Sequence, residues 1–396
     1  MRQSSTAAGG APRGDGARGF APRVCFYAPL LWPLWSEGRV PFTGGAEVQQ
    51  ARIARGLAAR GLEVTVVSCD FGQPSPVTVH GVRVLRSYRV DAGWPVVRFF
   101  HPRLTGALSA LAAAAADVYY VRGASLEAGV AYEAARLRGA AFVFGAASAH
   151  DALRRLPELD NPRDRLWYRR ALRGAAAVMA QTEVQRRLFR EQYGIESRVV
   201  RNLVAMPESP ADPGANADVV WIATYKASKR PDWFLALARG LPRLRFVMCG
   251  VVPPPPASAA AWEAANRAAA ECPNLEVRGF LDHDGVPALL RSAALFVQTS
   301  PAEGFSNTML EAWASGVPTV ACADPDGIVA RERLGQQVST PEELTRAVGE
   351  WMADPARRRE AGERARAYVR AHHDPERVVA QMDEVFRGAA RAIERR

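Results

Sequence analysis

The sequence is poor in cysteine and has no long apolar run. Its five cysteines include no Cys-x-x-Cys pair, so the spacing typical of zinc sites and redox pairs is missing, and we expect buried, reduced thiols and no bound metal. The longest apolar candidate, residues 107–116, falls short of the roughly 18–20 residues that cross a bilayer. No apolar stretch follows the basic N-terminal residues as it would in a secretory signal. We therefore expect a globular, cytoplasmic protein with a flexible tail at residues 1–21.

Negative charge is also in short supply. The 396 residues contain 51 Lys and Arg against 41 Asp and Glu, a formal net charge of +10. Two interpretations stay open: a generally solvated basic surface, or attraction to phosphate-bearing substrates and an anionic membrane. Nucleic acid is not an expected partner, because the basic residues are not interleaved with aromatic residues in a recognisable module.

Short apolar runs alternate with longer helical patterns along the chain. This alternation is typical of parallel sheets covered by helices on both faces, and the length predicts two such domains. A stretch rich in turn residues predicts a linker at 206–218 between domains at 22–205 and 219–375. We expect a final helix at 376–396 that packs back on the first domain. Ligands of such sheets bind at the carboxyl ends of the strands, here in the cleft between the domains.

The most informative segment, residues 299–318, leaves an apolar strand, turns and opens a helix. Free N–H groups at a helix start suit a phosphate. Glu303 lies in the turn, where a carboxylate needs partners, and Glu311 lies about one turn into the helix. A capping box formed by Thr308 and Glu311 is an equally good interpretation of the second glutamate.

Glu303 and Glu311, spaced Glu-x7-Glu and introduced by Glu-Gly-Phe-Ser-Asn, resemble the motif of glycosyltransferase family 4. Members are retaining enzymes of the GT-B fold, in which two Rossmann-like doubly wound domains face each other across a cleft. The resemblance covers about residues 22–385. Three further matches support it: Gly44-Gly45 before a helix, Lys226 to Arg230 after a strand, and the hinge pattern from Gln181 to Asn202. The chain departs from the family at Ala223-Thr224, where many members carry Gly-Arg.

The resemblance implies transfer of a sugar from a nucleotide-diphosphate sugar, UDP- or GDP-linked, to a hydroxyl acceptor, with retention and without metal or cofactor. Glu303 would hold the sugar, Glu311 the ribose, and the basic loop the diphosphate. The donor-binding candidates implied are Gly45, Lys226, Lys229, Arg230, Phe280, Glu303, Gly304, Phe305, Ser306, Asn307 and Glu311. The catalytic candidates are Glu303, Lys229, Lys226 and His150.

The acceptor is expected on the N-terminal domain. It would be a glycan, a lipid-linked sugar or a small molecule, as in polysaccharide biosynthesis, with peripheral contact at the inner face of a membrane. The candidates on this side are Gly44, Trp32, Arg122, His150 and Asp151. His150 either assists deprotonation of the acceptor or is an ordinary loop histidine. The aromatic loop 29–35 either covers an acceptor or membrane lipid, or packs on its own domain. A sugar-nucleotide epimerase and a binding protein without transfer activity are the rival functions.

Overall fold

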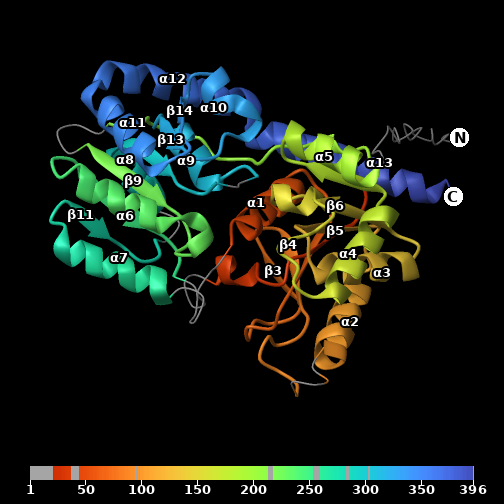
Figure 1. Ribbon diagram of the computed structural model, residues 1–396. Helices are drawn as coiled ribbons and strands as arrows, with labels where there is room; N and C mark the ends of the chain where they lie inside the picture. The colour runs from red at the N-terminus through yellow and green to blue at the C-terminus, as the bar shows by residue number, and fades with distance from the viewer. Residues whose placement is uncertain are drawn as a thin grey trace, which may run out of the picture.

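The structure is a computed structural model that describes residues 21–36, 44–94, 97, 99–212, 217–252, 259–281, 285–301 and 304–395. It contains two α/β lobes, each built around one sheet, with the C-terminal helix lying along the first lobe (Figure 1). None of the described helices is both long and apolar enough to span a bilayer.

The first lobe has an eight-stranded sheet in the order β3-β4-β2-β1-β5-β6-β7-β8. All neighbouring pairs are parallel except β3 with β4. The strands are β1 (Val24–Tyr27), β2 (Val64–Ser68), β3 (Val77–Val79), β4 (Val82–Arg86), β5 (Val118–Arg122), β6 (Ala141–Gly145), β7 (Ala177–Ala180) and β8 (Arg198–Val199).

The second lobe has a six-stranded, fully parallel sheet in the order β11-β10-β9-β12-β13-β14. Its strands are β9 (Asp218–Ile222), β10 (Arg245–Cys249), β11 (Leu275–Val277), β12 (Ala293–Gln298), β13 (Thr319–Ala321) and β14 (Gly335–Gln337). Every residue of β9 and β12 is buried, as expected where helices cover both faces of a parallel sheet.

Helices form the outer layers of both lobes. Two apolar clusters flank each sheet, one on either face. The helices are α1 (Gly45–Ala59), α2 (Thr105–Ala114), α3 (Leu126–Leu137), α4 (Pro162–Gly174), α5 (Glu183–Tyr193), α6 (Pro231–Gly240), α7 (Ala259–Glu271), α8 (Gly285–Ser292), α9 (Asn307–Ser315), α10 (Ile328–Arg331), α11 (Pro341–Ala353), α12 (Pro355–His372) and α13 (Pro375–Glu394).

Both sheets reverse their strand order at one place. In the first sheet the chain runs outward from β1 through β2 and then returns to place β5 on the other side of β1; in the second, β12 returns beside β9 in the same way. The loops at the carboxyl ends of such a pair diverge and leave a crevice that ligands occupy. The chain therefore builds one crevice after β1 and β5 and another after β9 and β12.

The last helix joins the core of the first lobe rather than the second. Val379, Met382 and Phe386 of α13 are buried with side chains of α1 and β1. Gly56 of α1 makes this possible, because a Cβ atom there would come within 2.5 Å of a methyl group of Val379. The close helix approach fastens α13 to the first lobe.

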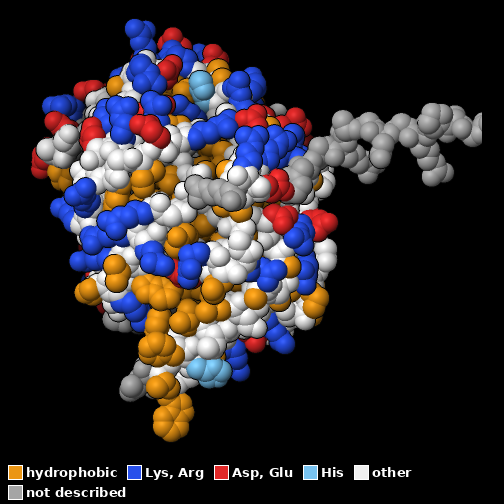
Figure 2. All heavy atoms as spheres, turned by 90° about the vertical axis from the view of Figure 1, so that its right-hand side faces the viewer, with side chains coloured by type: hydrophobic (Ala, Val, Ile, Leu, Met, Phe, Trp, Pro, Cys, Tyr) orange, Lys and Arg blue, Asp and Glu red, His pale blue; other side chains and the backbone are white. Residues whose placement is uncertain are grey.

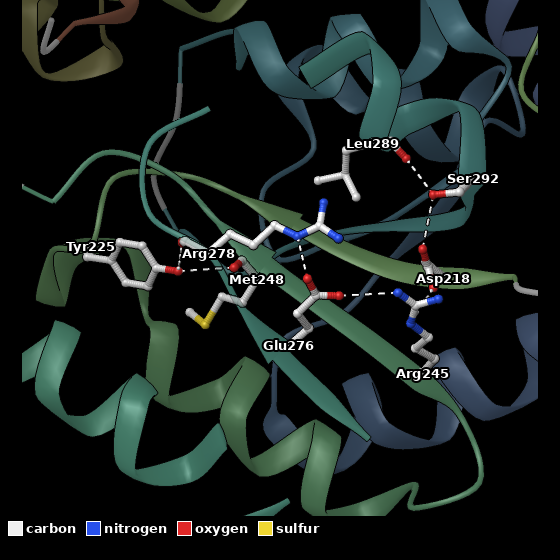
Figure 3. Close-up of polar contacts among 8 residues, drawn as sticks. All are labelled: Asp218, Tyr225, Arg245, Met248, Glu276, Arg278, Leu289 and Ser292. Carbon is white, nitrogen blue, oxygen red and sulfur yellow. Dashed lines mark hydrogen bonds and ion pairs between the residues drawn. The ribbon is translucent and has the colours of Figure 1, made fainter. Parts of the chain in front are cut away.

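A polar network spans the neighbouring strands β9, β10 and β11 (Figure 3). The buried carboxylate of Asp218 accepts from the Ser292 hydroxyl at 3.0 Å and lies 3.4 Å from Arg245. Arg245 also bonds Glu276, whose pKa is lowered chiefly by its hydrogen bond from Arg278. Since Asp218 and Arg245 begin their strands, this part of the network lies at the sheet edge opposite the crevice and serves strand alignment.

Candidate active site

One large cavity lies between the lobes. Its volume is about 820 Å³, within the range of sites that bury a sizeable small molecule. Both crevices contribute to its wall, through Arg122 at the end of β5 and through residues that follow β1, β9 and β12. The lining residues with charged, imidazole or amide side chains are Arg52, Arg55, His80, Arg122, Gln181, Asn202, Lys229, Gln298, Asn307 and Glu311.

The electrostatics of this wall favour an anion. Arg52, Arg55, Arg122 and Lys229 line the cavity against the single carboxylate of Glu311 among the described lining residues. Cationic groups in a concave site raise the local concentration of an anionic ligand and stabilise it once bound. Among the described residues no group of three His, Cys, Asp or Glu side chains is arranged to hold a metal ion.

The wall from the second lobe is built by the turn after β12 and the start of α9. Ser306 is the N-cap of α9, since its hydroxyl accepts from the N–H of Met309 at 3.3 Å. The interpretation of Thr308 and Glu311 as a capping box is therefore wrong, because the N-cap is Ser306, two residues before Thr308. Glu311 instead lies one turn into the helix with its carboxylate 2.9 Å from Arg52 of the other lobe. Glu303 lies outside the described residues.

Phe305, Ser306 and Asn307 line the cavity. Phe305 is buried between Trp313 and His373, with ring centroids 5.9 and 4.8 Å away. This packing anchors the turn and leaves its two following residues at the cavity wall. Phe280, whose side chain is about half exposed, also lines the cavity.

Gly304 faces the other lobe rather than the cavity. A Cβ atom at this position would come within 2.9 Å of the Ala147 carbonyl and 3.0 Å of the side-chain amides of Gln181 and Gln185. The carbonyl oxygen of the Gln181 amide also accepts from the N–H of Phe305 at 3.1 Å. The glycine is thus required for the close approach of the lobes.

The basic loop after β9 divides its residues between two places. Lys229 lines the cavity, whereas Lys226 and Arg230 do not. Arg230 is instead bonded to Asp232 at 2.9 Å and stacked on Trp233, and Lys226 is exposed. Lys226 is the N-cap of a short 3₁₀ turn, η4 (Ala227–Lys229), and Lys229 is its last residue.

The backbone of Lys229 is held firmly to the next strand. Its carbonyl accepts from the Thr299 hydroxyl at 2.5 Å, and that hydroxyl in turn accepts from the buried Trp221 indole at 2.9 Å. This chain of hydrogen bonds ties the ends of β9 and β12 together. It places the lysine beside the turn that leads into α9.

The first lobe contributes the Gly44-Gly45 turn at the start of α1, and both glycines line the cavity. The Glu47 side chain folds back over this turn, so that a Cβ atom on Gly44 would come within 1.8 Å of its carboxylate. Burial raises the pKa of Glu47, against the opposing effects of its own backbone N–H and of Arg122. Arg122 lines the cavity and donates to Asn202 at 2.6 Å.

Asn307 joins the two lobes at the base of the cavity. Its amide nitrogen donates to the Gly45 carbonyl at 2.7 Å, and its oxygen accepts from Gln49 at 3.0 Å and from Asn202 at 3.1 Å. A second clasp lies further away, where the carboxylate of Asp326 accepts from two backbone N–H groups at the start of α5, at 2.8 and 2.9 Å.

Sequence reasoning missed Gln49, Arg52, Arg55 and Asp326. The only local signal in the sequence was that Gln49, a polar residue, lies on an otherwise apolar face of its helix, and many ordinary surface residues give the same signal. The hydrogen-bond partners of Gln49, Arg52 and Asp326 lie more than 100 positions away in the sequence.

Three residues expected on the acceptor side lie outside the cavity wall. His150 is bonded through Nδ1 to Glu158 at 2.7 Å. Asp151 is buried and accepts from the N–H groups of Ala147 and Ser148; burial raises its pKa, and these hydrogen bonds oppose the shift. The carboxylate therefore shapes the loop after β6, whose residue Ala147 lines the cavity, but Asp151 itself does not line it.

Trp32 is half-buried in the 3₁₀ turn η1 (Trp32–Trp35), where its backbone N–H donates to the Ser68 hydroxyl at 3.2 Å. Trp32 thus packs on its own lobe, as one of the two interpretations has it, but the end of the loop does not. Leu34 and Trp35 line the cavity instead, and Trp35 meets His80 edge to face at 6.1 Å.

Comparisons with known proteins agree with this architecture. Residues 44–204 match the model of the glycosyl transferase 4-like domain, and residues 216–354 match that of the glycosyl transferases group 1. A search of curated protein sequences finds no match.

Among solved structures, the chain is similar to sucrose-phosphate synthase from Thermosynechococcus elongatus, with a TM-score of 0.76 and 17% identity over 93% of this chain and 99% of that one. It is also similar to Anabaena Alr3699/HepE in complex with UDP-glucose, with a TM-score of 0.71 and 15% identity over 92% and 98%. A glycosyltransferase from Rickettsia africae gives a TM-score of 0.67 at 13% identity over 92% and 98%. With two family models that together span most of its length and these shared two-lobed structures, the chain belongs to the group 1, family 4-like glycosyltransferases of the GT-B fold.

Proposed function

We propose that this glycosyltransferase moves a sugar from a nucleoside-diphosphate sugar to a hydroxyl acceptor with net retention and without a metal ion. The observation that carries the proposal is the cavity between the lobes, where Lys229 and the first turn of α9 come from the two loops at the switch point of the second sheet. In this reading residues 219–375 bind the donor and residues 22–205 hold the acceptor.

Leaving-group stabilisation is the main demand of the reaction, because breaking the glycosidic bond builds charge on the nucleoside diphosphate. Lys229 and the helix N-terminus would meet this charge. The chain has Ala223-Thr224 after β9, where many family members carry Gly-Arg, so this loop lacks that arginine. Arg52 and Arg55 of the opposite lobe, which also line the cavity, would supply the remaining positive charge. We assign Lys226 and Arg230 no part in this step, because neither lines the cavity.

Glu311 would bind the ribose hydroxyls. Its carboxylate is paired with Arg52, and both side chains are only 21% exposed. Donor binding would then exchange one partner of Glu311 for another while Arg52 turns to the phosphates. Glu303 would hold hydroxyls of the transferred sugar. We leave His150 out of the mechanism because it does not line the cavity and its Nδ1 is hydrogen-bonded to Glu158.

The acceptor would enter beside Leu34, Trp35 and His80. An aromatic side chain next to a polar one is suited to a sugar ring, whose faces are apolar and whose edges carry hydroxyls. A glycan or a lipid-linked sugar fits this rim, and closure of the lobes by Asn307 and Asp326 would exclude water from the donor.

Isothermal titration with UDP, GDP and ADP, followed by hydrolysis assays with the matching nucleotide sugars, tests the donor. We expect binding in the submillimolar range for at least one nucleotide, unchanged by EDTA. Proton NMR of the product with an accepted acceptor should show the anomeric configuration of the donor. Absence of nucleotide binding would overturn the proposal, and conversion of the donor sugar without acceptor would identify an epimerase instead.

A further inference from the structure

Four large apolar side chains are exposed on one short segment of the first lobe. Val90, Trp94, Val97 and Phe100 are 45%, 83%, 52% and 64% exposed. The other large exposed apolar residues of the described chain are spread over separate elements. Figure 2 shows the result as a narrow apolar protrusion at the lower end of the molecule. Clusters of this kind mark interaction sites, whereas single exposed apolar residues are ordinary.

The protrusion lies between β4 and α2, and its backbone is held by hydrogen bonds. The N–H of Val97 donates to the Trp94 carbonyl at 3.1 Å, and that of Phe100 donates to the Val97 carbonyl at 2.9 Å. Arg103 donates to the Val90 carbonyl at 2.9 Å and fastens the two ends of the segment together. The turn thus presents its apolar side chains outward while the chain ends are anchored to the lobe.

Positive charge lies at the base of this protrusion. The guanidinium of Arg163, in the first turn of α4, stacks on the Phe99 ring at 3.6 Å, and Phe99 meets Phe100 edge to face at 5.0 Å. Helix α4 carries five arginines against one aspartate. Figure 2 shows lysine and arginine side chains beside and above the protrusion.

We propose that Val90, Trp94, Val97 and Phe100, here termed the docking tip, insert into the interface of an anionic lipid bilayer. A narrow tip suits a bilayer better than a protein partner, because a stable protein interface needs roughly 800 Å² of complementary surface on each side. Tryptophan and phenylalanine partition well into the headgroup region, and arginines behind them gain from the negative surface potential of acidic lipids. The docked lobe is the one proposed to hold the acceptor, so the tip would bring the enzyme to lipid-borne acceptors.

Co-sedimentation tests this proposal, with the full chain mixed with vesicles of phosphatidylcholine alone or of phosphatidylcholine and phosphatidylglycerol, whose acidic headgroups supply the negative surface potential. We expect binding to the anionic vesicles that weakens as salt rises from 0.05 to 0.5 M, the approximate range over which screening becomes strong. The double variant Trp94→Ala/Phe100→Ala should bind at least about tenfold less, because each ring loses its apolar transfer.

Leu137→Ala is the matched control, since Leu137 is 71% exposed at the end of α3, outside the docking tip. It should bind like the wild type, and equal thermal midpoints will show that all variants fold. Failure of the wild type to bind anionic vesicles, or undiminished binding by the double variant, would overturn the proposal. So would self-association in gel filtration that the double variant abolishes, because the tip would then serve a protein contact. None of these variants touches the cavity, so nucleotide binding reports separately on the proposed transferase function.

Discussion

Replacing Lys229 with methionine removes one positive charge from the cavity and keeps most of the side-chain volume. Lys229 is half-buried at the cavity wall, and its backbone is fixed through Thr299 to the end of β12. A hydrogen bond to a charged group contributes about 1.5–3 kcal/mol when its partner stays partly shielded from water. We therefore expect Lys229→Met to weaken binding of the accepted nucleoside diphosphate about ten- to a hundredfold.

The assay is isothermal titration of the diphosphate and of the corresponding nucleoside against each variant. Lys226→Met is the matched control, because Lys226 lies three residues earlier in the same loop but outside the cavity wall. The Lys229 variant should lose affinity for the diphosphate and keep its affinity for the nucleoside. Equal diphosphate affinity in Lys229→Met and wild type, or a larger loss in Lys226→Met, would refute the assignment of the loop.

Three further predictions concern closure and stability. Asp326→Ala leaves two N–H groups of α5 without an acceptor, which destabilises the closed arrangement of the lobes by about 1 kcal/mol. Small-angle scattering of this variant should therefore show a larger radius of gyration. The control Asp324→Ala removes a cap of α10 within one lobe and should leave the radius of gyration unchanged. Gly304→Val would press a side chain on the Ala147 carbonyl, so kcat should fall at least tenfold while nucleotide affinity holds; an unchanged kcat would count against the close approach. Burial lowers the pKa of His373 to about 3. As the pH falls below about 6.5, the unfolded chain therefore binds a proton at His373 while the folded chain does not. The free energy of unfolding should then decrease, by up to about 1.4 kcal/mol per pH unit. Urea titrations of His373→Gln should show a shallower decrease than the wild type, and identical slopes would contradict this cause.

Much of the fold was predictable because its information is local. Continuous apolar runs such as those of β1 and β9 predict strands that are covered on both faces, and a parallel sheet places the carboxyl ends of all its strands on one edge. The positions of Lys229 and Asn307 after such strands followed from the same rule, before any side chain was seen. The start of α9 did not, because Ser306 and Thr308 are both good N-caps and only the path of the turn selects the first.

The sequence by itself determined two parallel α/β units, the loops that meet at their switch points, and the family motif around Glu303 and Glu311. Only the tertiary structure decided that Lys229 faces the cavity and Arg230 does not, that His150 is held by Glu158, and that Glu311 meets Arg52. The physical reason is the separation along the chain over which each kind of interaction acts. Periodicity and turn chemistry act over a few residues, whereas the pair Arg52–Glu311 joins positions 259 apart, and its geometry depends on how two separately folded sheets close on each other.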